Sequence, residues 1–128
     1  MRTHLTKLFT GLFALGALAL TGCSSDYRVD FQILTDAPPE VFVTSDLIEI
    51  PAGMAVGVRA LPVVDDERTN DRLELFPQRN NIVGIEPGLE ERTWVIWAKN
   101  PGSTAVDVFI DGERVTSLTA VGVDPLVD

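Results

Sequence analysis

The chain contains a single cysteine, Cys23, and its thiol is the strongest nucleophile that the sequence offers. The only histidine, His4, precedes it, so no histidine follows Cys23 to serve as a general base or a metal ligand. Because there is no second cysteine, the thiol cannot form a disulfide within the chain. Taken alone, a single cysteine of this kind is compatible with a buried or reactive thiol in a secreted protein.

The residues before Cys23 are organised as a secretion signal. Arg2 and Lys7 make the start basic, and residues 8–20 form an apolar run of 13 residues. A membrane-spanning helix needs about 20 apolar residues, so this run is typical of a signal helix that is later removed. The following residues, Leu20-Thr21-Gly22-Cys23, resemble the lipobox of bacterial lipoproteins.

This resemblance implies that the Gly22–Cys23 bond is cut and that Cys23 carries diacylglycerol and an acylated amine, with chains such as palmitate. Two or more acyl chains hold a protein stably on a membrane, whereas one binds only marginally. Ser24 stands where an aspartate favours the inner membrane in enteric bacteria. We therefore expect a protein of the cell envelope, on the outer membrane rather than the inner, that faces the periplasm.

The chain after the signal is acidic and has the size of one domain. Removing the first 22 of 128 residues leaves 106, and removing Arg2 and Lys7 leaves 8 basic against 19 acidic residues, a net charge of −11. This charge argues against nucleic acid as a partner. The expected organisation is a signal peptide at 1–22, an acylated cysteine and tether at 23–30, a sandwich at 31–123 and a loose tail at 124–128.

Alternation of apolar and polar residues predicts an all-β domain. No segment after the signal keeps an apolar period of 3.6, and about seven to nine short strands separated by turn residues favour a β-sandwich. Asp111-Gly112 predicts a type I′ hairpin, and Gly57 a bulge. Strands are expected at residues 29–34, 41–43, 47–50, 54–64, 73–75, 82–85, 92–99, 104–110 and 114–123.

Residues 46–123 resemble a single bacterial immunoglobulin-like domain of the group 2 type, which is repeated in adhesins and cell-surface proteins. Where such domains carry a tryptophan before a polar turn, this chain has Leu75-Phe76-Pro77. The resemblance implies an immunoglobulin-like β-sandwich with a structural or interaction role. The matching segments are Ile48 to Gly53 with Val58 and Ala60, Arg79 to Ile85, and Asn100 to Thr104.

A second candidate site is the acidic stretch at residues 65–71. Asp65, Asp66, Glu67 and Asp71 offer the carboxylate oxygens that Ca²⁺ prefers. The stretch lacks the glycine of a calcium-binding loop, and the neighbouring arginines compete for the carboxylates, so a solvated loop is the competing interpretation. A small ligand-binding, calcium-binding or inhibitory envelope lipoprotein stays open as the alternative function.

Catalytic constellations are weak after the signal. Lys99 is the only lysine left to act as a base for a serine, and no nucleophile motif surrounds any serine. Trp94 and Trp97 fall on opposite faces of one strand, which favours core packing over a platform for sugars. We expect no enzymatic activity and no cofactor. The expected partners are the membrane, through the lipid, and another envelope protein.

Overall fold

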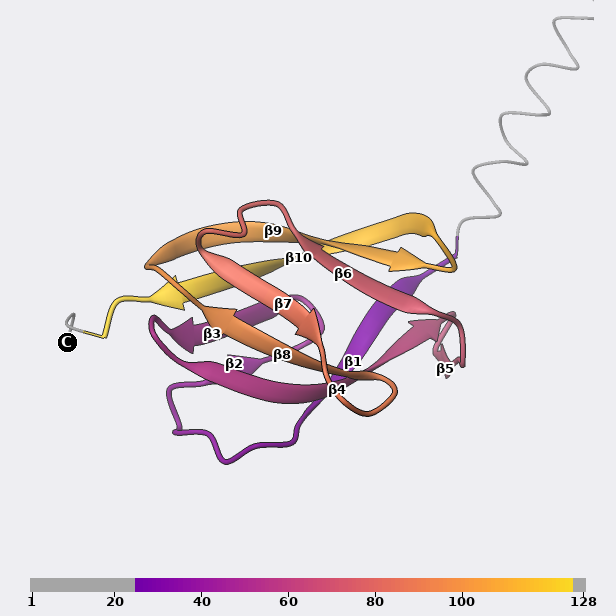
Figure 1. Ribbon diagram of the computed structural model, residues 1–128. Coiled ribbons are helices and arrows are strands. Elements are labelled where there is room, and N and C mark those ends of the chain that lie inside the picture. Colours follow the sequence, from indigo (N-terminus) through magenta and orange to yellow (C-terminus); the bar gives the residue numbers. More distant parts are fainter. Residues whose placement is uncertain (1–24, 126–128) are drawn as a thin grey trace, which may run out of the picture.

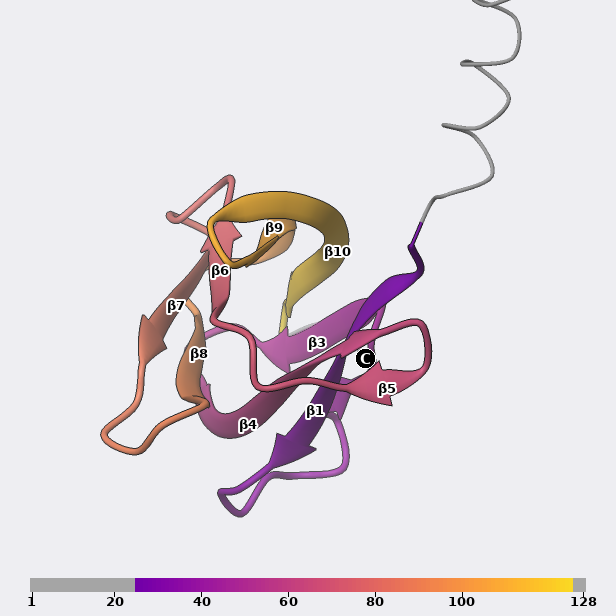
Figure 2. The same cartoon turned by 90° about the vertical axis from the view of Figure 1, so that its right-hand side faces the viewer.

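Ten strands in two facing sheets make up the computed structural model, which describes residues 25–125 (Figures 1 and 2). The first sheet has the order β1-β4-β8-β7, with β5 also paired to β4, and the second has the order β2-β3-β10-β9-β6. The first sheet comprises β1 (Tyr27–Ile33), β4 (Ala55–Val64), β5 (Glu67–Arg68), β7 (Val83–Pro87) and β8 (Thr93–Ala98). The second comprises β2 (Phe42–Val43), β3 (Leu47–Pro51), β6 (Leu73–Pro77), β9 (Gly102–Ile110) and β10 (Glu113–Val123).

The strand order is that of an immunoglobulin-like domain, in which strands A, B, E and D form one sheet and C, F and G the other. β1, β4, β8 and β7 occupy the positions of A, B, E and D, and β6, β9 and β10 those of C, F and G. Neighbouring strands pair antiparallel except β3 and β10, which are parallel. The predicted immunoglobulin-like β-sandwich is therefore confirmed.

Small and branched aliphatic side chains fill the space between the sheets. Every second residue of β4 from Val56 to Pro62 is buried, as the period of two predicted. In β8, Trp94 packs against the core while Trp97 is half-exposed on the outer face, so the two indoles lie on opposite faces as expected. Each of the nine expected strands has a counterpart in the structure.

The tenth strand, β5, was not predicted, because it lies inside the acidic stretch that was expected to be a loop. Asp65 and Asp66 both adopt positive φ, 50° and 66°, and turn the chain so that β5 pairs with the end of β4. Aspartate tolerates this left-handed conformation better than most residues. The predicted Asp111-Gly112 turn has the same signs of φ, 52° and 83°, and joins β9 to β10.

The bulge predicted at Gly57 is wrong. β4 pairs with β8 without interruption from Ala55 to Arg59, and the register shift in the structure lies in β10 instead. Gly57 has a different role, because its N–H donates to the hydroxyl of Thr35 at 3.1 Å. A Cβ atom at this position would lie 3.1 Å from the Thr35 methyl carbon.

The two ends of the domain lie at opposite ends of the sandwich, since β1 begins on the right of Figure 1 and β10 ends on the left. Within residues 25–125, no helix is long and apolar enough to cross a membrane. The apolar run at 8–20, the predicted cleavage site at Gly22 and Cys23, and the last three residues of the predicted tail lie outside the described residues.

Candidate functional site

The four carboxylates predicted as calcium ligands are not brought together. Glu67 is exposed on β5, and Asp71 accepts a hydrogen bond from the Thr69 hydroxyl at 3.1 Å. Asp65 and Asp66 turn towards β1 instead. Nowhere in the described part of the chain do three or more histidine, cysteine, aspartate or glutamate side chains form a group that could hold a metal ion.

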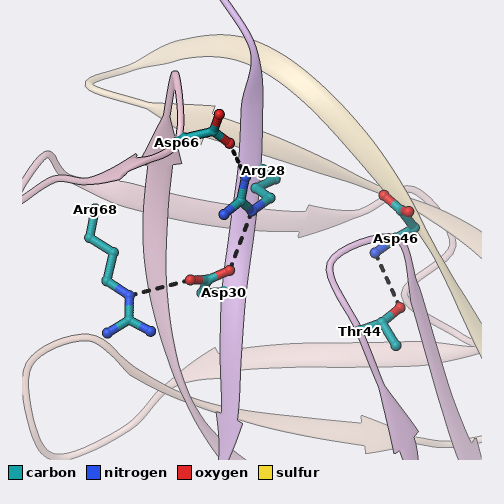
Figure 3. Close-up of polar contacts among 6 residues, drawn as sticks. All are labelled: Arg28, Asp30, Thr44, Asp46, Asp66 and Arg68. Carbon is teal, nitrogen blue, oxygen red and sulfur yellow. Dashed lines mark hydrogen bonds and ion pairs between the residues drawn. The ribbon is translucent and has the colours of Figure 1, made fainter.

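Asp65 and Asp66 connect the start of β1 to the β4–β5 turn through hydrogen bonds. The Asp65 N–H donates to the Asp26 carbonyl at 2.8 Å, and the Asp26 N–H donates to Asp65 Oδ1 at 2.9 Å. Arg28 Nη1 donates to Asp66 Oδ1 at 2.8 Å (Figure 3). This hydrogen bond from Asp66 raises the pKa of Arg28 above its ordinary value, so the guanidinium stays charged.

Asp30 joins two arginines in the same cluster (Figure 3). Its carboxylate lies 3.5 Å from Arg28 Nε and 3.3 Å from Arg68 Nε. Arg68 therefore pairs with β1 rather than with the carboxylates of its own stretch. We call the set Asp26, Arg28, Asp30, Asp65 and Asp66 the N-terminal clamp. β1 begins at Tyr27, within the range that the sequence assigned to a tether, and the clamp holds it from its first residues.

Removing the Asp65 side chain is expected to weaken the clamp. Asp65→Ala deletes the acceptor for Asp26 N–H and places alanine at positive φ, and we expect a loss of about 1 kcal/mol in the free energy of unfolding. Urea titration followed by tryptophan fluorescence measures it. Glu67→Ala is the control, and a change within about 0.5 kcal/mol is expected because Glu67 is exposed. Equal losses in both variants would contradict the role of the clamp.

A hollow of about 380 Å³ lies at the open edge of the sandwich, where β7 ends the first sheet and β6 ends the second. β7 is the outermost strand on the left of Figure 2. The strands come from different sheets, so the sandwich itself creates this site. We call it the edge groove, which is lined by Phe76 and Pro77 of β6, Ile85 and Glu86 of β7, and Trp97 and Lys99 at the end of β8.

Two large aromatic side chains of the edge groove are exposed to solvent. Phe76 is 49% and Trp97 50% exposed. Phe76 packs edge-on against Phe109 with 5.3 Å between ring centroids, which fixes its orientation. Aromatic side chains are enriched in protein interfaces, and a rimmed apolar patch on a surface is typical of a binding site.

Lys99 supplies a positive charge to the edge groove. Its Nζ lies 5.4 Å from the Trp97 ring centroid, within the range of a cation–π interaction. Its stem crosses Gly84, where a Cβ atom would lie 2.9 Å from Lys99 Cε. None of the ion pairs among the described residues involves Lys99. In a chain of strongly negative net charge, this ammonium is available to an external anion.

The backbone around the edge groove is held by hydrogen bonds. Thr104 is buried, and its hydroxyl accepts from Arg79 N–H at 2.8 Å and donates to the Ala105 carbonyl at 3.0 Å. The Lys99 N–H donates to the Ile82 carbonyl at 2.7 Å, which fixes Lys99 beside the start of β7. These hydrogen bonds fix the backbone that carries the groove residues, so the groove is not formed by an unsupported loop.

Sequence reasoning missed the edge groove. The sequence predicted that one of Trp94 and Trp97 lies in the core and the other partly at a rim, and the core contact of Trp94 and the half-exposed Trp97 confirm this, but no groove was predicted beside Trp97. Phe76 lies far from Trp97 in sequence and in the other sheet, so no local pattern could place the two side chains on one groove. One signal in the sequence pointed to this region. Bacterial immunoglobulin-like domains carry a tryptophan before the polar turn, and this chain has Leu75-Phe76-Pro77 there instead.

Comparisons with protein-family models, with curated proteins and with solved structures found no match to this chain. No ligand, partner or activity can therefore be transferred from a relative. The function is therefore proposed from the leader and Cys23 in the sequence and from the edge groove in the structure.

Proposed function

We propose that the chain is a lipoprotein of the bacterial cell envelope, in which acylated Cys23 anchors one immunoglobulin-like domain of the bacterial group 2 type. The apolar leader and Leu20-Thr21-Gly22-Cys23 support the anchor. The observation that carries the proposal is the position of Cys23, three residues before Asp26, which is already hydrogen bonded to the β4–β5 turn. Cleavage at Gly22 thus removes the leader and leaves the sandwich whole.

The short connection determines where the anchored domain sits. Three extended residues span about 10 Å, so the N-terminal clamp lies close to the lipid headgroups. A mechanical force on the lipid anchor is transmitted to β1. This strand pairs with β4 at seven successive positions from Tyr27 to Ile33. This arrangement supports a structural role, since the clamp and the β1–β4 ladder transmit the load to the sandwich.

The edge groove supports an interaction role for the domain. Exposed Phe76 and Trp97 offer apolar contact area, and Lys99 offers a charge for an acidic group of the partner. The proposed role is non-catalytic, and the cleaved chain has neither a histidine nor a free thiol to act as a base or nucleophile. The carboxylates at 65–71 serve the clamp or point elsewhere, so the calcium-binding alternative gains no support from their geometry.

Ser24 favours the outer membrane as the location of the anchor, because aspartate is the residue that retains such proteins in the inner membrane of enteric bacteria. The acidic surface agrees with a protein held by lipid rather than by charge. A chain with 19 acidic residues is repelled by anionic headgroups, so adsorption through basic patches is not available to it.

The anchor is tested by replacing its only thiol. Cys23→Ser is expected either to release the protein from the membrane fraction or to leave an uncut precursor, which stays in that fraction through its leader. Fractionation with an immunoblot that resolves precursor from mature chain measures this. Ser24→Ala is the matched control and should fractionate like the natural chain. Normal processing together with unchanged membrane association of Cys23→Ser would contradict the proposal.

A further inference from the structure

We propose that β7 pairs edge to edge with β7 of a second copy of this chain, in an antiparallel register centred on Ile85. The edge groove is then one half of a symmetric interface, and each copy completes the other. This inference rests on the proposed interaction role of the groove but not on the lipid anchor. It is carried by the backbone of β7, by the charges beside it and by the hollow next to it.

The backbone of β7 has an unpaired side. The Lys99 N–H donates to the Ile82 carbonyl and the Gly88 N–H to the Thr93 carbonyl, and alternation along the antiparallel ladder between them makes Gly84/Trp97 and Glu86/Val95 hydrogen-bonded pairs. The N–H and C=O of Ile85 between them point away from β8. No strand pairs with β7 on that side within residues 25–125. An exposed edge of this kind is a template for another strand.

The charges select one register. The Lys99 side chain lies over Gly84, so a pairing centred on Gly84 brings the two Lys99 side chains of like charge together. A pairing centred on Glu86 places the two Glu86 carboxylates opposite each other, which is also repulsive. A pairing centred on Ile85 places Glu86 opposite the partner's Gly84, which Lys99 crosses in each copy. Each Glu86 then meets the partner's Lys99, and the interface gains two ion pairs related by the symmetry.

Apolar contacts accompany this register. In this register the two Ile85 residues exchange N–H···O=C bonds. The Ile85 side chain packs against the core and lines the edge groove together with Phe76 and Pro77. A second hollow of about 250 Å³ between β6 and β7 is lined by Ile85, Phe76 and Pro87 among others, so the gap has room for the incoming side chain. Pro87 has no N–H, and it limits the ladder to the short stretch around Ile85.

The symmetry of this pairing fits two lipid anchors in one membrane. Antiparallel strands of a continuous sheet are related by a two-fold axis perpendicular to the sheet. With the first sheet parallel to the bilayer, this axis is normal to the membrane, and both copies of β1 begin at the same height. Anchoring also concentrates the chains in two dimensions, which favours a short interface.

Charge reversal tests the pairing in the full processed protein. Sedimentation equilibrium in a density-matched detergent should show a dimer of the natural chain, and Glu86→Lys and Lys99→Glu should each weaken association by about tenfold or more. The double variant E86K/K99E should recover it. An equimolar mixture of the two single variants should form the heterodimer, because each copy then meets an opposite charge. Glu113→Lys, at the β9–β10 turn, is the matched control and should associate like the natural chain.

A monomeric natural chain, or a dimer that all the variants preserve, would overturn the inference and leave the lipid anchor untouched. Failure of the mixed variants to associate would also overturn it, since only reciprocal pairing predicts their recovery. If a charge-reversed variant does not keep the natural circular dichroism spectrum, Glu86→Gln and Lys99→Gln replace it. Each neutral variant is then expected to weaken the dimer by a smaller factor, and no change in either would count against the pairing.

Discussion

Gly122→Ala is expected to destabilise the domain by about 2–3 kcal/mol, although it adds a single methyl group. Gly122 is buried in β10, opposite Gly102 of β9. A Cβ atom there would overlap the carbonyl oxygen of Asn100 and lie 3.1 Å from its carbonyl carbon. These are backbone atoms of the β8–β9 turn, so the turn or β10 itself must move. The melting temperature should fall by roughly 10 °C or more.

Gly57→Ala is the matched control for this variant. Gly57 also lies in a strand, but the atom that a Cβ would meet is the Thr35 methyl group, a side chain outside the regular strands. We expect a change within about 1 kcal/mol in either direction, because alanine also restricts the unfolded chain. Thermal unfolding of both variants compares them. A Gly122→Ala domain as stable as the control would show that β10 and the β8–β9 turn do not approach as closely as described.

Ile96→Ala is expected to cost about 2–5 kcal/mol, a large part of the stability of a domain of this size. Ile96 is fully buried in β8, which pairs with β4 on one side and β7 on the other. Removing its side chain loses buried apolar area and leaves a cavity between the sheets. Urea titration followed by the fluorescence of Trp94 and Trp97 measures the loss.

Val95→Ala provides the control for Ile96→Ala, because it shortens a neighbouring side chain on the opposite face of the same strand. Val95 is 42% exposed and contributes to the outer surface rather than to the core. Its replacement should cost less than about 1 kcal/mol. A cost for Val95→Ala equal to that for Ile96→Ala would mean that the two faces of β8 are not distinguished as buried and exposed.

The sandwich could be predicted because most strands have one buried and one solvated face. In β4 and β9 the side chains alternate residue by residue, and this local pattern is enough to identify both the strand and its inward face. The pairing of β3 with β10 is different. It joins the third strand of the chain to the last in parallel, and no local signal in either segment predicts it.

The acidic stretch shows how residue types alone can mislead. Its carboxylates suggested Ca²⁺, but the positive φ of Asp65 and Asp66 makes a tight turn that directs both towards β1. Hairpin turns of this kind are recognised by glycine, as at Asp111-Gly112, and the Asp-Asp turn lacks that signal. The edge groove needed the tertiary fold, since Phe76 and Trp97 line one hollow only when the two sheets pack.

The central claim is that lipid on Cys23 holds this domain at a membrane, and the mass of the mature chain tests it most directly. Mass spectrometry of protein extracted from membranes is expected to show an amino terminus at Cys23 that carries diacylglycerol on sulfur, with or without a further acyl group on the amine. A chain that retains residues 1–22 with an unmodified thiol would contradict the claim.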